Sequence, residues 1–412
     1  MREALNIAHH YLKGVTMEPL QGIRIIDATS NASGPMATGM LADQGADVIR
    51  FETVGVGDPS RHVGGTRGGV SAYNAYMNRN KRSMAVDLKS AQLRPWLYKL
   101  IATADVFVQN SRPGALDRCG FGFEDLHRIN PQLIYVSISG FGATGPGAKQ
   151  RVYDPVIQCV SGFAAAQGTG GAPALMKTIA SDKVAALTAA QAISSALFAR
   201  ERGTIRGHQV ELSMLDASLA FLWPEVFWNH SFVGTEGVQP KPPIAEFYRL
   251  LRTVDGFITL IIVGDGEFAG ACRAMGLEAL LADPRFKTLS DRFANYSPML
   301  AAFEQVAVGM ASDTLVARLL AEDVPCAKVN TLDEVFDDPR VTACASVIEY
   351  EHPQGGRMRQ ARAPAIFAGE PSPVRLPSPG LCEHTVELQQ SVGGSADDIA
   401  ALHQAGAIGC VG

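Results

Sequence analysis

Residues 23–52, "IRIIDATSNASGPMATGMLADQGADVIRFE", hold a strand, a helix and a second strand in succession. Short apolar and β-branched runs predict buried strands at 23–29 and 46–52. The alanine-rich stretch between them predicts a helix over 36–45, which ends at Gly45. A strand, a helix and a strand in this order indicate parallel pairing, because parallel strands need a crossover connection.

The same alternation continues through the first half of the chain. Further strands are predicted at 83–88, 104–110 and 132–139, with helices at 90–103 and 123–130. The predicted fold class is therefore α/β, with a doubly wound, Rossmann-like sheet in a large domain.

The sequence changes in character after residue 220, where aromatic residues and prolines accumulate. Residues 247–263 predict two antiparallel strands joined by a turn at Asp255-Gly256, and residues 346–362 predict a hairpin. We expect an N-terminal extension (1–16), a large Rossmann-like domain (17–224), a small α+β domain with linkers (225–335), and a C-terminal segment (336–412) that returns to the large domain.

Bulk composition excludes several classes of protein. Of the 412 residues, 47% are hydrophobic and 19% charged, and the net charge is −5, so neither disorder nor a nucleic-acid partner is expected. Apolar runs fall short of the roughly 20 residues that a membrane span needs. The first residues do not resemble a signal peptide, and the seven cysteines are scattered without a C-x-x-C, which favours free thiols in the cytoplasm. The histidines do not cluster, so no metal site is expected.

Two glycine motifs resemble nucleotide-binding sequences. "GFGATG" (140–145) follows a strand, but the next residues do not open a helix, so we expect no NAD site. "GDGEFAG" (264–270) follows a predicted hairpin and is interpreted as a turn. Without a dinucleotide fingerprint, Glu52 is interpreted as a charge at the end of a strand, facing water.

One acid stands out at the start of an apolar helix, "TIASDKVAALTAAQAISSALFARER" (178–202). Backbone N–H groups at a helix start favour a carboxylate, so we expect Asp182 to be ionised at neutral pH. Ser181 and Asp182 could simply cap the helix. The many small residues of this helix suggest central packing, which would open its start into a cleft where an acid could act as a nucleophile.

The order of sequence blocks carries a further resemblance. From Met17 onward the blocks include "PLQGIRIIDAT", "GDPSR", "NRNKRSMAVDLK", "NSRPGALDRCGFGFEDL", "YDPVIQCVSG", "GHQVELSMLDA" and "PSPGLCEHT". The chain thereby resembles the class III CoA-transferase family of the CaiB/BaiF type, which includes formyl-CoA and carnitine CoA-transferases. The resemblance implies a large domain built from both ends of the chain, a smaller domain between them, and an interlocked homodimer.

The resemblance also implies a reaction and its residues. Asp182 would be the nucleophile that moves CoA from an acyl-CoA to a free carboxylic acid, through an aspartyl anhydride and an aspartyl-CoA thioester, with no cofactor beyond CoA. Residues matching the family's CoA contacts are Ala32, Ser33, Asn78, Asn80, Lys81, Asn110, Ser111, Arg112, Arg118, Arg151, Val152, Tyr153 and Asp154.

This sequence also departs from the family pattern. Thr53 stands where a basic residue is common, Ala32 replaces a polar side chain, and no glycine-rich loop is evident in the small domain, which argues against formyl or oxalyl substrates.

An α-methylacyl-CoA racemase of the same fold is the alternative, but the histidine that it would use is replaced here by Tyr153. Tyrosine has an ordinary pKa of about 10 and is a poor base at pH 7. An NAD-dependent oxidoreductase and a non-catalytic CoA-binding subunit are more distant alternatives.

Overall fold

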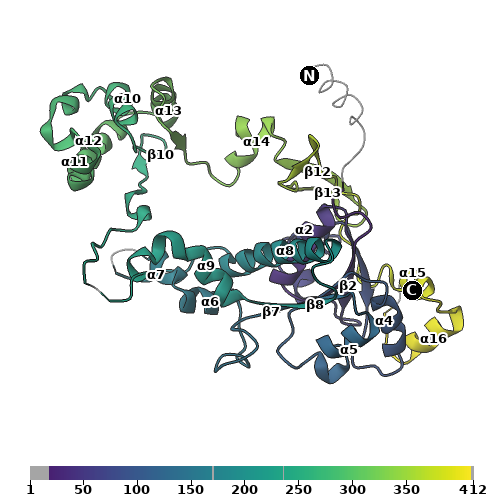
Figure 1. Cartoon of the computed structure of the whole chain (residues 1–412). Coiled ribbons are helices and arrows are strands. Elements are labelled where there is room, and N and C mark those ends of the chain that lie inside the picture. Colours follow the sequence, from purple (N-terminus) through teal and green to yellow (C-terminus); the bar gives the residue numbers. More distant parts are fainter. Residues whose placement is uncertain (1–17, 169–170, 235, 410–412) are drawn as a thin grey trace, which may run out of the picture. The chain divides into compact units, whose positions relative to one another are not determined.

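The computed structural model describes residues 18–168, 171–234 and 236–409, so the predicted N-terminal extension lies outside the described residues. The chain divides into two compact units (Figure 1). The first comprises the chain up to Pro224 together with the part from Ala345 onward, and the second is Glu225–Cys344.

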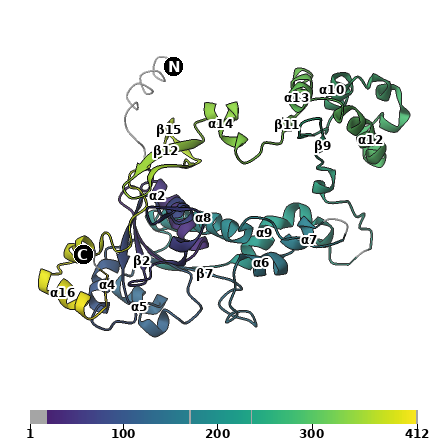
Figure 2. The same cartoon turned by 180° about the vertical axis from the view of Figure 1, so that it is seen from behind.

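A parallel sheet of six described strands forms the centre of the first unit (Figures 1 and 2). The strands are β1 (Arg24–Ala28), β2 (Asp47–Glu52), β5 (Lys81–Ala85), β6 (Val106–Gln109), β7 (Ile134–Ser139) and β8 (His208–Ser213). Their order across the sheet is β5-β2-β1-β6-β7-β8. The chain thus winds outward from β1 in one direction and from β6 in the other, which is the doubly wound arrangement. The predicted α/β class with a parallel central sheet is confirmed.

Helices cover both faces of this sheet. The helices of the first unit before residue 227 are α2 (Ser33–Asp43), α3 (Ala72–Asn78), α4 (Arg94–Ile101), α5 (Phe123–Ile129), α6 (Asp154–Ser161), α7 (Phe163–Gln167), α8 (Ala180–Glu201) and α9 (Met214–Val226), the last crossing the boundary between units. Neighbouring strand residues point to opposite faces, so Ile25 packs in the core with α2 and α8 while Ile26 packs in the core with α4 and α5.

The predicted strand at 83–88 is wrong in its boundaries, because β5 begins two residues earlier, at Lys81. The charged residues at its start concealed it, since the side chain of Lys81 is fully buried and paired. The helix predicted over 36–45 is α2, which begins earlier, at Ser33, and ends at Asp43. Gly45, just beyond its end, has φ +104°, a conformation that a side chain would strain.

The C-terminal segment returns to the first unit and covers the β5 edge of the sheet. It contains β12 (Val347–His352), β13 (Gly356–Ala361), β14 (Ile366–Phe367), β15 (Glu370–Pro371), α15 (Thr385–Ser391) and α16 (Ala396–Gln404). β12 and β13 form the predicted antiparallel hairpin. The backbone N–H of His384 donates to Ser83, and that of Gly409 donates to Ala85, both in β5. This edge is therefore paired with the end of the chain.

The second unit has its own core of described apolar residues. Its elements are β9 (Leu251–Arg252), β10 (Phe257–Leu260), α10 (Asp265–Met275), α11 (Leu289–Ala294), α12 (Tyr296–Ala307), α13 (Ser312–Ala321), β11 (Cys326–Lys328) and α14 (Pro339–Ala343). The hairpin at 247–263 is confirmed, because β9 and β10 are antiparallel and Thr253 donates its N–H to Gly256. The turn predicted at 264–270 is wrong: α10 begins at Asp265, since Glu267 accepts the N–H groups that precede it.

Candidate active site

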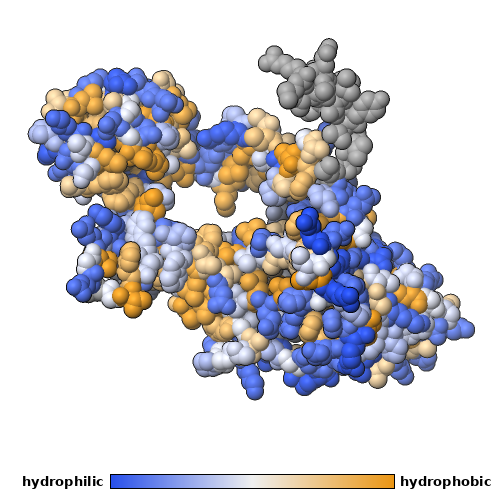
Figure 3. Space-filling view, viewed as in Figure 1, coloured by the Kyte–Doolittle hydropathy of each residue, from blue (hydrophilic) through white to orange (hydrophobic). Residues whose placement is uncertain are grey.

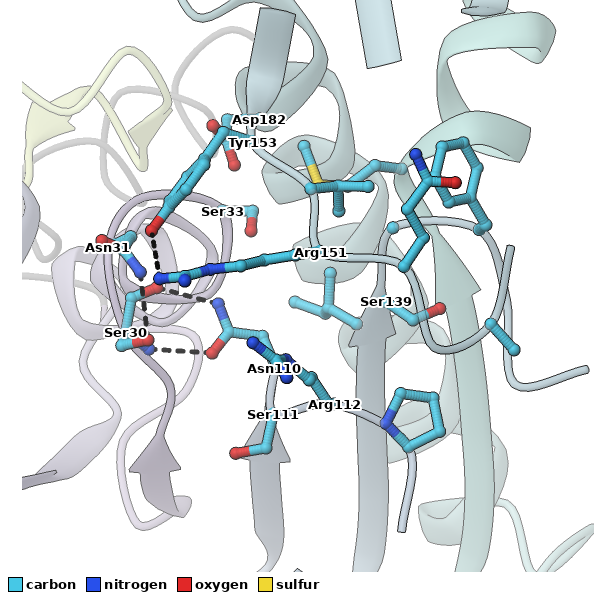
Figure 4. Close-up of a pocket in the computed structure, with 18 residues that line it drawn as sticks. Ser30, Asn31, Ser33, Asn110, Ser111, Arg112, Ser139, Arg151, Tyr153 and Asp182 are labelled. Atoms are coloured by element: carbon cyan, nitrogen blue, oxygen red, sulfur yellow. Dashed lines mark hydrogen bonds between the residues drawn. The ribbon is translucent and has the colours of Figure 1, made fainter. Parts of the chain in front are cut away.

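A cavity of about 180 Å³ lies at the carboxyl ends of β1, β6 and β7 (Figure 4). The strand order of the sheet reverses between β1 and β6. Ligands bind doubly wound sheets at this point, because the loops that follow the two strands diverge there. The labelled lining residues in Figure 4 are Ser30, Asn31, Ser33, Asn110, Ser111, Arg112, Ser139, Arg151, Tyr153 and Asp182.

The loop between β1 and α2 is held from two sides. The side-chain oxygen of Asn110 accepts the N–H of Ser30 at 2.9 Å, and its NH₂ group donates to the Ser30 carbonyl at 2.8 Å. The N–H of Asn31 donates to a carboxylate oxygen of Asp58 at 3.1 Å. Asn31 has φ +66°, a left-handed conformation that asparagine tolerates better than most residues. The loop is thereby fixed at the cavity.

A buried group of charges lies beneath this loop. Lys81 is fully buried, and its ammonium donates to Asp27 at 2.9 Å. The guanidinium of Arg50 lies 2.9 Å from Asp58 and 3.8 Å from Asp27. Burial alone would raise the pKa of Asp27, but Lys81 and Arg50 lower it to about 2. Burial lowers the pKa of Lys81 to about 8 despite the attraction of Asp27.

Glu52 belongs to the same buried group. The expectation that it faces water is wrong, because its side chain is fully buried and pairs with Arg61 at 2.7 Å. Ser83 donates its hydroxyl to the same carboxylate at 2.6 Å. Burial would raise the pKa of Glu52, but these hydrogen bonds and the charge of Arg50 lower it.

Asp182 stands in the first turn of α8 and is partly buried in the cavity wall. Ser33, the first residue of α2, lies near its carboxylate, and the hydroxyl and backbone N–H of Ser33 favour the ionised form of Asp182. Two helix starts therefore meet at one acid, and Figure 4 shows Ser33 and Asp182 close together. Gly34 lets the first turn of α2 pack closely against Thr29, since a Cβ there would lie 2.3 Å from a Thr29 side-chain atom.

The pKa of Asp182 shifts in the direction opposite to the expectation from the helix start. Burial first, and then the charge of Asp154, raise it to about 6, although the hydrogen bonds from Ser33 lower it. Burial and a like charge thus outweigh the helix start. With a pKa of about 6, the carboxylate is still mainly ionised at pH 7, and it is more basic than an ordinary aspartate.

The structure brings many of the predicted site residues to this cavity. Those that line it are Ser33, Asn110, Ser111, Arg112, Arg151, Val152, Tyr153 and Asp182. Ala32 and Asp154 are buried and do not line it. Arg151 lies with its guanidinium 6.0 Å from the Tyr153 ring centroid and donates to the Tyr153 hydroxyl at 3.5 Å.

Three other predicted contacts lie inside the first unit, away from the cavity lining. Asn78, Asn80 and Lys81 are all buried. Asn78 accepts a hydrogen bond from Lys81, and Asn80 accepts the N–H groups of Arg375 and Leu376 in the C-terminal return. These side chains hold the fold, and their contact with CoA stays a prediction.

Arg118 lines a second, larger cavity of about 1030 Å³. Thr53 and Lys89 lie in the same lining, which also contains Glu52, Asp58 and Asp87, so two cations and three acids border this space. Ser30 and Ser111 line both cavities. The two spaces therefore border one another along these two serines.

Sequence reasoning missed several residues of the site. Ser30 and Asn31 lie in the loop after β1, and Ser139 is the last residue of β7; this position at the carboxyl ends of parallel strands was the signal that could have identified them. Tyr73 of α3 lies near the site as well: burial and the charges of Asp182, Asp58 and Asp154 raise its pKa to about 12. No local pattern marks Tyr73, because packing of α3 places it.

A family model described as CoA-transferase family III matches residues 20–385. The chain belongs to CoA-transferase family III. It is 32% identical to a formyl-CoA:oxalate CoA-transferase of Escherichia coli, over 95% of this chain and 99% of that protein. It is also 32% identical to an acyl-CoA transferase of Fusarium pseudograminearum, over 94% of this chain and 88% of that protein.

Solved structures agree with this family III CoA-transferase assignment. A CaiB/BaiF family protein from Brucella suis is 31% identical, with a TM-score of 0.79 over 91% of this chain and 99% of that chain. A Mycobacterium tuberculosis protein is 27% identical, with a TM-score of 0.78 over 90% of this chain and 99% of that chain. The protein is therefore an enzyme of this family, whose substrates are CoA thioesters.

The described residues of this family III CoA-transferase contain neither a cluster of metal ligands nor a membrane-spanning helix. Within residues 18–409, apart from the gaps given above, no three His, Cys, Asp or Glu side chains gather as a metal site would require. Over the same described residues, every helix is too short or too polar to cross a bilayer.

Proposed function

We propose that this enzyme moves CoA from an acyl-CoA thioester to a free carboxylic acid, with Asp182 as its covalent nucleophile. The observation that carries the proposal is a basic, partly buried carboxylate in a cavity where two helix starts meet. A racemase is not favoured, because the family and its curated relatives are named as transferases. Tyr153 also occupies the position where the racemase pattern needs histidine.

The proposed reaction has four displacement steps. A carboxylate oxygen of Asp182 attacks the thioester carbon, a C–O bond forms, the C–S bond breaks, and CoA thiolate leaves an aspartyl anhydride. The thiolate then attacks the aspartyl carbon, which gives aspartyl-CoA and releases the donor acid. The acceptor carboxylate attacks aspartyl-CoA, expels the thiolate and forms a second anhydride. The thiolate finally attacks the acceptor's carbonyl carbon, which releases the new thioester and regenerates the Asp182 carboxylate.

Each step passes through a tetrahedral intermediate with a negatively charged oxygen. Preorganised donors that point at this oxygen stabilise the transition state. The hydroxyl and backbone N–H of Ser33 lie near the Asp182 carboxylate and favour its ionised form. We assign these two groups to the oxyanions that form on the aspartyl carbon.

CoA itself would occupy both cavities. The smaller cavity, which holds Asp182, suits the thioester end, and the larger one suits the nucleotide with its phosphates. Arg118 and Lys89 supply positive charge to the larger cavity, while Ser30 and Ser111 mark the passage between the two. Lys81 is buried with its ammonium fully paired, so we assign it a structural role.

Replacing Arg118 tests the nucleotide position. The change Arg118→Gln should raise the Kd for CoA roughly 10- to 100-fold, because a hydrogen bond to a charged group contributes about 1.5–3 kcal/mol. Isothermal titration with CoA measures this effect. Arg128 is an exposed arginine of α5 whose guanidinium pairs with Asp125, and Arg128→Gln is the matched control. Equal affinities for CoA in both variants would place the nucleotide elsewhere.

An isotope experiment tests the transfer itself. The enzyme is incubated with a panel of acyl-CoAs and with an acceptor acid whose carboxylate carries ¹⁸O. Because the bridging oxygen of the second anhydride stays on aspartate, the peptide that contains Asp182 should gain one ¹⁸O in a single turnover, and peptide mass spectrometry detects this gain. Formate, oxalate and succinate belong in the panel of acids, since curated relatives include a formyl-CoA:oxalate transferase.

The racemase alternative predicts a different isotope pattern. In D₂O it would place deuterium on the α-carbon of a single acyl-CoA without any acceptor acid. A turnover that exchanges α-hydrogen and leaves the Asp182 peptide unlabelled would therefore contradict the proposed transferase.

We also propose a homodimer, as the resemblance implies. Figure 3 shows apolar side chains over α8 and α9 in the first unit. Leu187 and Phe198 of α8 and Phe221 of α9 each expose more than half of their surface. An exposed apolar surface of this kind is typical of a protein interface. Light scattering should give twice the chain mass of 43.8 kDa, and a mass of one chain would contradict the dimer.

A further inference from the structure

Asp154 lies directly behind the helix start that carries Asp182. It is the first residue of α6, its side chain is buried, and one of its carboxylate oxygens accepts the backbone N–H of Asp182 at 3.1 Å. A carboxylate from another helix therefore takes the capping position at the start of α8, which Ser181 or Asp182 would occupy in the simplest interpretation of the sequence.

Gln158 of α6 fixes this carboxylate. Its NH₂ group donates to the second oxygen of Asp154 at 2.6 Å and to the Thr178 carbonyl at 3.1 Å, and its side-chain oxygen accepts the N–H of Met176 at 2.8 Å. Gln158 is buried. The segment that leads into α8 is thus tied to Asp154 by one glutamine, and the direction in which Asp182 points depends on this tie.

The charge of Asp154 is not cancelled by an ion pair among the described residues. The titratable groups that interact electrostatically with Asp182 are Asp154 from α6 and Tyr73 from α3. Arg151 and Tyr153 line the same cavity, and Lys183 is the next residue of α8. The ammonium of Lys183 donates to the Thr178 hydroxyl at 2.7 Å. Asp154 is the group whose charge most raises the energy of an ionised Asp182.

An elevated basicity matters for the chemistry proposed above. An ordinary aspartate has a pKa of about 3.9 and a thiol one of about 8.5, so a tetrahedral intermediate between them expels the carboxylate far more readily than the thiolate. A more basic carboxylate leaves less readily, which favours anhydride formation. A neighbouring negative charge supplies that basicity without removing the nucleophile.

We propose that Asp154 is a positioning residue, held by Gln158, which fixes the backbone of Asp182 and whose negative charge keeps that carboxylate basic enough to displace CoA thiolate. The inference rests on the proposed function, since it requires Asp182 to be the nucleophile. Burial and the charge of Asp154 support it by raising the pKa of Asp182 to about 6.

The test follows formation of the aspartyl intermediate between pH 4 and pH 8. Acyl-CoA is mixed with excess enzyme, hydroxylamine traps the activated carboxyl as a hydroxamate, and mass spectrometry quantifies the modified Asp182 peptide. Asp154→Asn keeps an oxygen for the N–H of Asp182 and removes only the charge. In this variant, the pH at which the rate of intermediate formation falls to half on the acid side should move downward by about 1 pH unit. The rate on the plateau should fall several-fold, and the Kd for CoA should stay unchanged.

Two further variants separate charge from geometry. Asp154→Glu retains the charge, so its acid limb should stay at the wild-type pH even if its rate falls. Gln158→Leu loosens the segment before α8 and should lower the rate at every pH. If Asp154→Asn does not fold, Asp154→Ser provides the same test, because serine also lacks the charge.

The outcomes distinguish this inference from the proposed function. Suppose that the wild-type enzyme forms the hydroxamate and that Asp154→Asn has the same acid limb in its pH–rate profile. Asp154 then has no influence on the acidity of Asp182, so the inference is overturned while the proposed function stands. If the wild-type enzyme forms no hydroxamate at Asp182, both the inference and the proposed function are overturned.

Discussion

Asp182→Asn should lose roughly 10⁴- to 10⁶-fold in transferase turnover, the range over which other covalent enzymes fall when a central catalytic residue is removed. Asparagine keeps the size of the side chain and an oxygen for the donors of Ser33, so CoA binding should persist. What disappears is the negatively charged oxygen that attacks the thioester. Steady-state transfer and CoA titration, measured on one preparation, separate the two effects.

Gln191→Ala is a suitable control for this change. Gln191 is exposed on the same helix, and its side chain bonds only to Ser195 at 3.2 Å among the contacts described. This variant should transfer CoA like the wild-type enzyme. Substantial turnover in Asp182→Asn, or an equal loss in both variants, would remove Asp182 from the role of nucleophile.

The same substitution should also change how stability depends on pH. The pKa of Asp182 rises from 3.8 to about 6 on folding, so the folded state binds a proton more tightly than the unfolded chain does. Stability from this group is complete below about pH 4 and is lost as pH rises through about 6. Asp182→Asn should therefore melt higher than the wild-type enzyme at pH 8 but not at pH 4. Such a gain is common when a functional charge is removed from an active site.

Lys81→Met should lower the free energy of unfolding by about 3–5 kcal/mol, the usual cost of removing one partner of a buried ion pair. Methionine fills similar space, so the loss comes from charge and hydrogen bonds rather than from a cavity. The ammonium donates to Asp27, to the Pro35 carbonyl and to Thr38, all within 2.9 Å. Without it, Asp27 keeps only the more distant Arg50 as a cation. Urea unfolding measures the difference.

Arg82→Met is the neighbouring control on the same strand. Arg82 pairs with Asp47 and Glu387 at 2.7 Å, but these groups are partly exposed to water. Removing such a pair costs about 1 kcal/mol or less. A similar small cost for Lys81→Met, accompanied by a weakened affinity of the folded enzyme for CoA, would instead favour the predicted role of Lys81 as a CoA contact.

Lys81 can be interpreted as a CoA contact or as the partner of a buried ion pair, and the sequence alone does not decide between the two. The parallel sheet could be predicted because each strand is a local apolar run, and local patterns need no knowledge of distant residues. The burial of Lys81 depends on Asp27, which lies 54 positions away in the sequence. From the sequence alone, a strand that begins with two basic residues is therefore predicted to begin later, and the charge of Lys81 is interpreted as free to bind a phosphate.

Asp182 could be found from its position before a helix of small residues, together with the family resemblance. The pKa of Asp182 could not be predicted, because the helix start lowers it and burial raises it, and only the packed structure determines which effect is larger. Asp154 illustrates the same limit. It stands beside Tyr153 in a block that resembles CoA contacts, yet its side chain turns inward to the start of α8.

The pairing of β5 with the last residues of the chain has a consequence for synthesis. On its outer edge, this strand and the residues that flank it bond to residues beyond 375, namely Leu376, His384, Ala407 and Gly409. On the ribosome, the amino-terminal half emerges with one border of its sheet still open, and an open border readily joins another chain. The intervening unit must be translated before that border can close. The outer border of this sheet is thus closed only after Gly409 has been made, and a product that stops earlier would be prone to aggregate.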